Sequence, residues 1–311
     1  MRNILILFML FTFSSETVYA QGFFRKKAKD VDYEQEYASF QSVRPPELPK
    51  IMDFAGEHVP LENFDTRESL ERELTVNMFW HSQTIFIVKL ANRFFPIIEP
   101  ILRKNGVPDD FKYLCVAESG LQQVVSPAKA VGFWQILGST GKELGLEINN
   151  EVDERYNIER STEAACIFLK KSHKLFGSWT MAAASYNMGR SGLTKQVIRQ
   201  KSISYHDLTL GEETSRYLFR ILALKLIISN PVKYGFNLKK DELYPPYKYR
   251  EIIVNTPIPS WADFAHQYGT NYKILKMLNP WLREAHLTNK NNKVYYIKVP
   301  EVGYRKNAYS N

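Results

Sequence analysis

The strongest constraint on the fold is a long region, about residues 65 to 229, in which apolar residues recur every three or four positions. This spacing places them on one face of each successive helix. The pattern is clearest at Ser161 to Phe176 and at Glu212 to Ile228, and glycine and proline residues separate such segments. We therefore predict a mainly α-helical globular domain, whose first helix opens with a capping box formed by Asp65 and Glu68.

The N-terminal residues follow a different pattern. Residues 1 to 20 combine Arg2, a short apolar run and a small-residue site ending at Ala20, which predicts a cleaved secretory signal peptide. A membrane anchor is the other interpretation, but the apolar run is shorter than a bilayer requires. Residues 21 to 64 begin with a polar, basic stretch and are expected to form an exposed leader. The chain is thus expected to be exported to the periplasm or cell envelope.

The C-terminal part predicts a second, smaller domain. Residues 233 to 250 contain Tyr244-Pro245-Pro246-Tyr247, which favours extended backbone and is typical of a linker. Residues 251 to 311 then predict a β-α-α-β unit, whose elements are a strand at 251–254, a helix capped by Ser260, a helix at 272–278 and a strand at 294–299. The helical domain itself is expected at residues 65 to 232.

Charge narrows the class of partner. The chain carries 41 basic and 33 acidic residues, a formal net charge of +8, and removal of residues 1 to 20 would take one of each. An anionic partner is expected, and nucleic acid, anionic lipid and an acidic cell-wall polymer all fit. The predicted signal peptide argues against nucleic acid.

Cysteine and histidine usage bears on cofactors. Cys115 and Cys166 both fall in helical patterns, and no second cysteine or histidine stands at metal-ligand spacing from either. Buried free thiols are the favoured interpretation, although secretion also permits a disulfide. The six histidines are scattered and no glycine-rich phosphate loop is present. Neither a metal nor a nucleotide cofactor is expected.

One glutamate stands on an apolar stripe. In the segment from Pro108 to Gly120, Phe111, Leu114, Cys115 and Glu118 fall on a single helix face. Such a position disfavours the ionised carboxylate and raises its pKa, as a general acid at neutral pH requires. A glutamate that reaches solvent at the helix end, or that pairs with a buried arginine, is the competing interpretation.

Five segments resemble, in the same order, the lytic transglycosylases, and most closely their membrane-bound lytic murein transglycosylase D subgroup. The resemblance covers about residues 65 to 230. Its segments are Glu118-Ser119, the cleft-lining stretch Ser126 to Ile136, residues 152–165, residues 179–189 with Tyr186-Asn187-Met188-Gly189, and Glu213-Thr214 followed by Tyr217. The resemblance implies a lysozyme-like α-rich catalytic domain that cleaves the glycan strands of peptidoglycan.

The resemblance also implies roles for individual residues. Glu118 would be the single catalytic acid and base. Asp153 and Glu154 are not assigned such a role, because their position near a helix start predicts that they cap the helix or pair with Arg155. The residues expected to support the acid or bind the sugar are Ser119, Gly132, Phe133, Trp134, Gln135, Tyr186 and Asn187. Taken alone, the Trp134 side chain is more typical of a core than of a sugar platform.

The expected reaction cleaves the β-1,4 bond between N-acetylmuramic acid and N-acetylglucosamine and leaves a 1,6-anhydro end. Two other functions remain open: a hydrolytic muramidase like goose-type lysozyme, and a non-catalytic peptidoglycan-binding protein. Residues 251 to 311 resemble a degenerate LysM module, with Pro257-Ile258-Pro259-Ser260 where Gly-Asp-Thr is usual. This module would bind N-acetylglucosamine-containing glycans, although a purely structural cap on the catalytic domain fits nearly as well.

Overall fold

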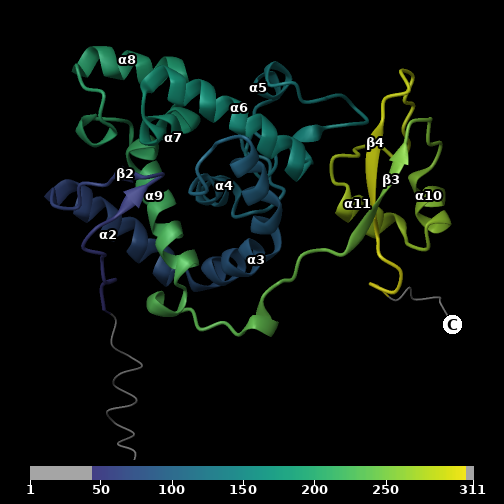
Figure 1. Ribbon diagram of the computed structural model, residues 1–311, viewed down its shortest axis with the longest axis horizontal. Coiled ribbons are helices and arrows are strands. Elements are labelled where there is room, and N and C mark those ends of the chain that lie inside the picture. The colour runs from purple at the N-terminus through teal and green to yellow at the C-terminus, as the bar shows by residue number, and fades with distance from the viewer. Residues whose placement is uncertain (1–43, 306–311) are drawn as a thin grey trace, which may run out of the picture. The chain divides into compact units, whose positions relative to one another are not determined.

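The computed structural model describes residues 44–305, so the predicted signal peptide and residues 21–43 of the predicted leader lie outside the described residues. The described chain is mainly α-helical, as predicted, with two small antiparallel sheets (Figure 1). It has a large hydrophobic core in the helical region and a smaller one in the C-terminal residues. Within residues 44–305, no helix combines the length and apolarity needed to cross a membrane.

The helical region contains eight α-helices among the described residues. They are α2 Phe64–Phe79, α3 His81–Lys104, α4 Phe111–Ser119, α5 Gly138–Glu143, α6 Ile158–Phe176, α7 Trp179–Met188, α8 Arg190–Gln200 and α9 Glu212–Ser229. Single 3-10 turns lie at Glu154–Tyr156, Tyr205–Asp207, Val232–Tyr234 and Lys240–Glu242. The helices predicted for 161–176 and 212–228 are confirmed, and α6 begins three residues earlier, where the Asn157 side chain accepts the backbone N–H of Arg160.

Helix α4 carries the predicted buried face. Phe111, Leu114 and Cys115 are each fully buried, and α4 packs against both α3 and α9. The helix ends at Gly120, which adopts φ 59° and donates its N–H to the carbonyl of Val116. A left-handed residue at this position reverses the chain at low conformational cost when it is glycine. The loop that follows α4 therefore starts two residues beyond Glu118.

A small hairpin belongs to the core and corrects the predicted leader. Strands β1 (Asp53–Phe54) and β2 (Glu57–His58) pair antiparallel, and Phe54 is fully buried with its ring 5.3 Å from that of Phe111. Met52, Val59 and Leu61 are also buried. The expectation of an exposed leader up to residue 64 is therefore wrong from Met52 onward, because a few apolar residues in a polar stretch are enough to anchor it.

The hairpin also caps a helix of the candidate site. The Glu57 carboxylate accepts hydrogen bonds from the Ser178 hydroxyl at 2.8 Å and from the N–H groups of Trp179 and Thr180 at the start of α7. Burial raises the pKa of Glu57, but these hydrogen bonds outweigh burial and leave it below the usual value. A carboxylate here also complements the positive end of the helix dipole. The hairpin thus fixes the start of α7.

Two local expectations need correction. Helix α2 begins at Phe64, and its N-cap Asn63 makes no side-chain capping hydrogen bond, so the predicted capping box of Asp65 and Glu68 is wrong. The predicted linker is partly core, since Tyr234 and Phe236 are buried beside Leu74. Exposed polar residues at the start of α2 gave a capping pattern that the packing of the helix does not require.

The extended segment after residue 243 is fastened to α3. Arg93 donates to the carbonyl of Pro245 and to the hydroxyl of Tyr247, both at 3.0 Å. Its guanidinium also lies 4.9 Å from the ring centre of Tyr244 and 4.3 Å from that of Tyr247. This contact geometry suits a cation–π interaction. The Tyr-Pro-Pro-Tyr stretch is therefore held on the helical region along its length.

The C-terminal residues form the predicted β-α-α-β unit. Its elements are β3 Tyr249–Val254, α10 Trp261–Gln267, α11 Tyr272–Leu278 and β4 Tyr295–Pro300. The two strands pair antiparallel from Tyr249↔Pro300 to Val254↔Tyr295, and Trp261, Leu275 and Ile297 are buried between the sheet and the helices. The Ser260 hydroxyl accepts the N–H of Asp263, so the predicted cap of α10 is confirmed.

Phe54→Ala tests whether the N-terminal hairpin is part of the core. We expect the free energy of unfolding to fall by about 3–5 kcal/mol, the cost of emptying a buried phenylalanine site. The matched control is Ile51→Ala at a side chain that is 82% exposed, which should change stability by less than about 0.5 kcal/mol. Urea unfolding followed by circular dichroism measures both. Equal stabilities of the two variants would contradict this placement.

Candidate active site

Glu118 lies in the last turn of α4 and is half-buried. Its carboxylate accepts a short hydrogen bond from the hydroxyl of Tyr217, which projects from α9 and is 1% exposed. The hydrogen-bond partner of the carboxyl is thus a neutral donor and not a cation. An uncharged partner leaves the group free to exchange a proton with a ligand, whereas a buried ion pair would hold it ionised.

The surroundings of Glu118 raise its pKa to about 7. Burial is the main cause, because it disfavours the ionised form. The hydrogen bond from Tyr217 and the positive charge of Arg220 act in the opposite direction, and the negative charge of Glu213 adds a small upward contribution. A carboxyl group with this pKa is partly protonated at neutral pH. It can therefore give up a proton and later accept one.

Two predicted residues hold consecutive carbonyl groups of the loop between α4 and α5. The hydroxyl of Ser119 donates to the carbonyl of Phe133 at 2.8 Å, and the hydroxyl of Tyr186, from α7, donates to the carbonyl of Trp134 at 2.7 Å. Ser119 is buried and Tyr186 half-buried. The pKa of Tyr186 is raised well above its usual value by burial and then by the negative charge of Glu118. These contacts tie the loop to the helices on either side.

The same loop contains backbone conformations that few residues tolerate. Gly132 has φ 81°, and a Cβ atom there would lie 2.2 Å from the carbonyl oxygen of Arg155. Glycine is therefore required both by the backbone conformation and by the lack of space for a side chain. Gln135 adopts φ 48° although it has a side chain. Its amide nitrogen donates to the carbonyls of Gly132 at 2.8 Å and Val124 at 3.0 Å. These hydrogen bonds offset the cost of the left-handed backbone.

A cavity of 290 Å³ brings three predicted residues together. Gln135, Tyr186 and Asn187 line it, along with residues of α5, α6 and the end of α7. The Asn187 amide oxygen accepts the hydroxyl of Thr214 at 2.7 Å, which links the end of α7 to the start of α9. The cavity thus combines a few polar groups with apolar walls, which is typical of small-molecule sites.

The side chains of Phe133 and Trp134 lie inside the protein. Trp134 is fully buried, and its indole N–H donates to the hydroxyl of Thr162 at 2.8 Å. Phe133 is 3% exposed, and its ring centre lies 4.8 Å from that of Phe94. Phe133 also lines a separate cavity of 450 Å³, together with Phe94 and Tyr156. The indole of Trp134 packs as a core side chain and offers no platform for a sugar.

The acidic residues of the next segment are engaged in ion pairs: Asp153 pairs with Arg155, as predicted, whereas Glu154 pairs with Arg160 and not with Arg155. The carboxylate of Asp153 forms a two-point contact with Arg155, at 2.9 and 2.7 Å. Glu154 pairs with Arg160 at 3.3 Å. Both carboxylates are buried. Among residues 44–305 there is no cluster of three or more His, Cys, Asp or Glu side chains suited to a metal ion.

Both cysteines are buried free thiols, so the favoured interpretation is confirmed. Burial raises the pKa of Cys115 well above its usual value and that of Cys166 to about 12. A protonated thiol is a poor nucleophile. Neither cysteine is suited to nucleophilic chemistry, which leaves Glu118 as the candidate reactive group of this region.

The geometry agrees with the family that the sequence matches. Residues 95–208 match the family model described as the transglycosylase SLT domain, and this range contains Glu118, the loop at 129–136 and the Tyr186-Asn187 pair. The chain carries an SLT domain. Residues 250–303 match a second model, the soluble lytic transglycosylase C-terminal LysM-like domain.

Curated relatives extend the match beyond the SLT domain. The chain is 27% identical over 257 residues to the membrane-bound lytic murein transglycosylase D of Escherichia coli strain K12, and equally to that of Escherichia coli O6:H1. Each alignment covers 80% of this chain and 55% of the relative. The chain thus spans about half the length of these relatives.

Tyr217 lies outside the part of the chain that the SLT model matches, and the sequence predicted no contact between it and Glu118. A signal was nevertheless present. Tyr217, Ile221 and Leu224 share one buried face of α9, so the tyrosine hydroxyl stands on an apolar stripe as Glu118 does. Buried polar groups almost always have a hydrogen-bond partner. Glu118 and Tyr217, the polar residues on these two apolar faces, are hydrogen-bonded to each other.

Tyr217→Phe should raise the pKa of Glu118 in the SLT domain by about one unit, because it removes the hydrogen bond that favours the carboxylate. The carboxyl of the variant then stays protonated to a higher pH than the wild-type group, whose pKa is about 7. Carboxyl ¹³C chemical shifts followed across pH measure both values. Tyr205→Phe is the control, since the Tyr205 hydroxyl is bonded to main-chain carbonyls of α9. A fall in the pKa of Glu118 in Tyr217→Phe would contradict the assignment.

Proposed function

We propose that the protein is a lytic transglycosylase that cleaves the glycan strands of peptidoglycan. The observation that carries the proposal is the half-buried Glu118 carboxyl of the SLT domain, with a pKa of about 7 and a tyrosine hydroxyl as its hydrogen-bond donor. Most glycosidases use two carboxylates. The buried carboxylates of the neighbouring segment, Asp153 and Glu154, are both occupied by arginines. A single group acting as acid and then as base fits this arrangement.

In the first step, protonated Glu118 donates its proton to the glycosidic oxygen between N-acetylmuramic acid and N-acetylglucosamine. The bond from C1 of the muramoyl sugar to that oxygen breaks, and the N-acetylglucosamine end leaves as an alcohol. The acetamido group of the muramoyl sugar stabilises the oxocarbenium-like centre at C1. A pKa near the working pH serves this step, because a useful fraction of the acid is protonated.

In the second step, the Glu118 carboxylate takes the proton of the C6 hydroxyl of the same sugar, and the oxygen closes onto C1. The product is a 1,6-anhydro end, and no water is consumed. Tyr217 donates to the carboxylate during the interval between the steps. This hydrogen bond stabilises the ionised form, so the acid is strong enough to give up its proton despite burial.

The sugar at the cleavage point would meet the main chain of the loop at 132–134 and the side chain of Gln135. Tyr186 and Asn187 would form the facing wall, since they line the same cavity as Gln135. Ser119 acts through the loop, because its hydroxyl is committed to the carbonyl of Phe133. Trp134 likewise contributes through its main chain while its indole fills the core.

The location and partners follow from the substrate. Peptidoglycan lies in the cell envelope, so the protein would act there after export, as the pattern of residues 1 to 20 predicts. The net charge of +8 favours an acidic polymer at close range. The C-terminal LysM-like domain would add a second contact with the glycan strand, which keeps the enzyme on an insoluble substrate.

Glu118→Gln should keep the fold and lose at least about 10³-fold in turnover of purified peptidoglycan, because an amide neither donates nor accepts the transferred proton. The variant should also be at least as stable as the wild type above pH 7, where the wild-type carboxyl must ionise while half-buried. Glu143→Gln, at a side chain that is 60% exposed, is the control and should retain full turnover. Release of soluble muropeptides measures both variants. Normal turnover by Glu118→Gln would remove the proposal.

Product mass separates a transglycosylase from a muramidase. The proposed reaction consumes no water, so its reducing ends should be about 18 Da lighter than those of a lysozyme digest of the same peptidoglycan. Mass spectrometry of the released muropeptides reads this difference directly. Products that match the lysozyme digest would show hydrolysis, with Glu118 delivering water in place of the C6 hydroxyl.

A further inference from the structure

The main chain of the C-terminal unit forms hydrogen bonds with the main chain of one segment of the SLT domain, residues 151–153. Val152 forms an antiparallel bridge with Leu282, the N–H of Asp153 donates to the carbonyl of Trp281 at 2.9 Å, and the N–H of Arg283 donates to the carbonyl of Glu151 at 2.7 Å. The Val152 side chain is 1% exposed and belongs to the hydrophobic core of the C-terminal unit. This segment is therefore a component of both units.

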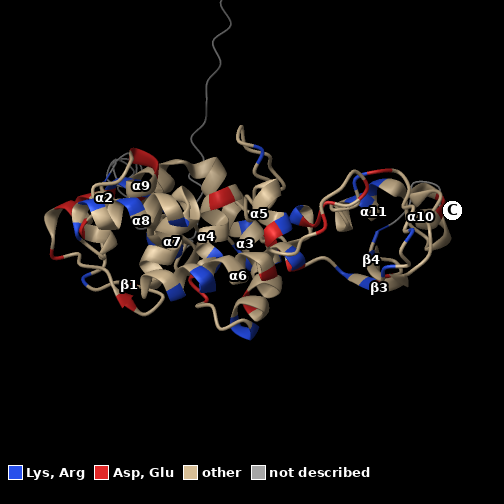
Figure 2. Cartoon of the chain, turned by 90° about the horizontal axis from the view of Figure 1, so that it is seen from above, with Lys and Arg blue, Asp and Glu red and all other residues tan. Residues whose placement is uncertain are grey.

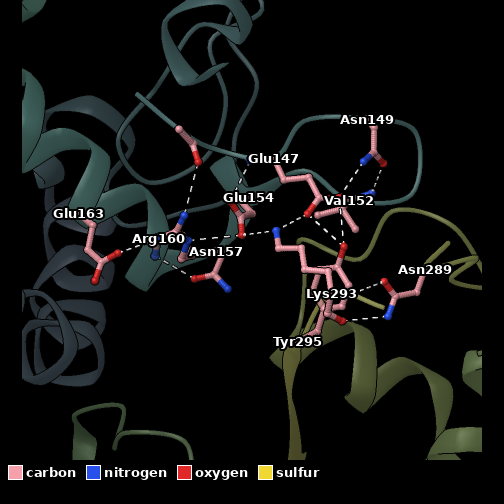
Figure 3. Close-up of polar contacts among 11 residues, drawn as sticks. Glu147, Asn149, Val152, Glu154, Asn157, Arg160, Glu163, Asn289, Lys293 and Tyr295 are labelled. Atoms are coloured by element: carbon pink, nitrogen blue, oxygen red, sulfur yellow. Dashed lines mark hydrogen bonds and ion pairs between the residues drawn. The ribbon is translucent and has the colours of Figure 1, made fainter. Parts of the chain in front are cut away.

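A cluster of polar side chains adds further contacts between the same two parts of the chain (Figure 3). Lys293, beside β4, donates to the carboxylate of Glu147 and lies 3.7 Å from that of Glu154. The hydroxyl of Tyr295 donates to Glu147 at 3.1 Å, and Glu154 also accepts the N–H of Glu147 at 2.8 Å. Figure 2 shows acidic and basic residues close together between helices α5 and α11. Residues 147–154 are thus held from two directions.

Residues 147–154 are followed directly by Arg155, whose side chain contacts the candidate sugar-binding loop. The guanidinium of Arg155 is fixed by the two-point contact with Asp153, and its remaining nitrogen donates to the carbonyls of Lys129 and Ile136, both at 3.3 Å. These carbonyls lie at the two ends of the loop that carries Gly132 and Gln135. The carbonyl oxygen of Arg155 occupies the space that a side chain at position 132 would need.

We propose that Arg155 is a positioning residue for the loop at 129–136, and that the C-terminal unit sets the position of Arg155 by pairing with residues 151–153. The inference rests on the proposed function, because it assigns the loop to the sugar at the cleavage point. The C-terminal unit then has a role in the reaction that is separate from any binding of glycan by its own surface.

The loop needs such a support for a physical reason. Both Lys129, with φ 63°, and Gln135, with φ 48°, adopt a left-handed backbone that is unfavourable for residues with a side chain. Strained conformations persist only where their surroundings determine them fully. Val131 and Ile136 exchange main-chain hydrogen bonds within the loop, and Arg155 adds a side-chain link between the carbonyls at its two ends, which the loss of Arg155 would remove. A displacement of about 1 Å at a reacting centre costs on the order of 10²-fold in rate.

The first arm of the test compares Arg155→Lys with Arg160→Lys in the full-length chain. Lysine keeps the charge but cannot span Asp153 and two carbonyls. We expect amide hydrogen exchange in residues 129–136 to rise at least about tenfold in Arg155→Lys and to stay unchanged in Arg160→Lys. Arg160 pairs with Glu154 and Glu163 and so tests the loss of an arginine from the same segment. On soluble glycan strands, kcat should fall about tenfold in Arg155→Lys while KM changes by less than about twofold.

The second arm tests the link to the C-terminal unit. Val152→Ala and Val254→Ala each remove two methyl groups from the same small hydrophobic core, but only Val152 lies on the segment that continues to Arg155. We expect faster exchange in residues 129–136 and a lower kcat only in Val152→Ala, with both variants unfolding at similar urea concentrations. The Val254→Ala control separates coupling from a general loss of stability.

Two results would overturn the inference. One is unchanged exchange in residues 129–136 of Arg155→Lys, and the other is equal exchange in that loop for Val152→Ala and Val254→Ala. Amide hydrogen exchange is measured without substrate, so a failure of this inference can be distinguished from a failure of the proposed function. If Glu118→Gln retained activity while Arg155→Lys still loosened the loop, the support of the loop would stand and the assigned chemistry would not.

Discussion

The partial burial of a single carboxyl group, Glu118, sets the requirements that the rest of the helical region meets. Burial favours the protonated acid, and a hydrogen-bond donor and a positive charge from another helix keep the ionised form accessible. Helix α4 supplies the acid and α9 supplies Tyr217, so the packing of these two helices controls the proton affinity of the site. The buried ring of Phe54 lies directly against α4 and extends this dependence to the N-terminal hairpin.

A second requirement comes from the loop between α4 and α5, which has only isolated β-bridges, between Val125 and Val131 and between Val131 and Ile136. Side chains bond further carbonyls of the loop: Ser119 bonds Phe133, Tyr186 bonds Trp134, and Arg155 bonds both ends. Each of these donors comes from a different part of the chain. Unpaired carbonyl groups in a protein interior are costly, so the loop has one well-defined shape. This shape places Gln135 beside Tyr186 and Asn187.

The sequence predicted those features that depend on local patterns or on the family resemblance. Helices α6 and α9, the β-α-α-β unit and the apolar face of α4 follow from spacing, and Glu118 stood out as the one charge on that face. The hairpin at 53–58 was missed because strands of two residues leave no period to read. The sequence predicts the pairing of Arg155 with its neighbour Asp153, but it does not predict the contact of Tyr217 with Glu118, across 99 positions, or of Arg155 with Lys129, across 26. Such partners are set by tertiary packing: the apolar face of α9 indicates that the Tyr217 hydroxyl is buried and needs a partner, but not which residue the partner is.

Val152 belongs in sequence to the helical region and in space to the C-terminal core. A cut of the chain in the Tyr-Pro-Pro-Tyr stretch would therefore leave the small domain without one of its own apolar side chains, and would expose that side chain on the larger piece. Recombination that exchanges C-terminal modules between related proteins would have to carry the stretch around position 152 with the module, or accept a replacement that matches it. The two modules are joined in a way that favours their inheritance as a pair.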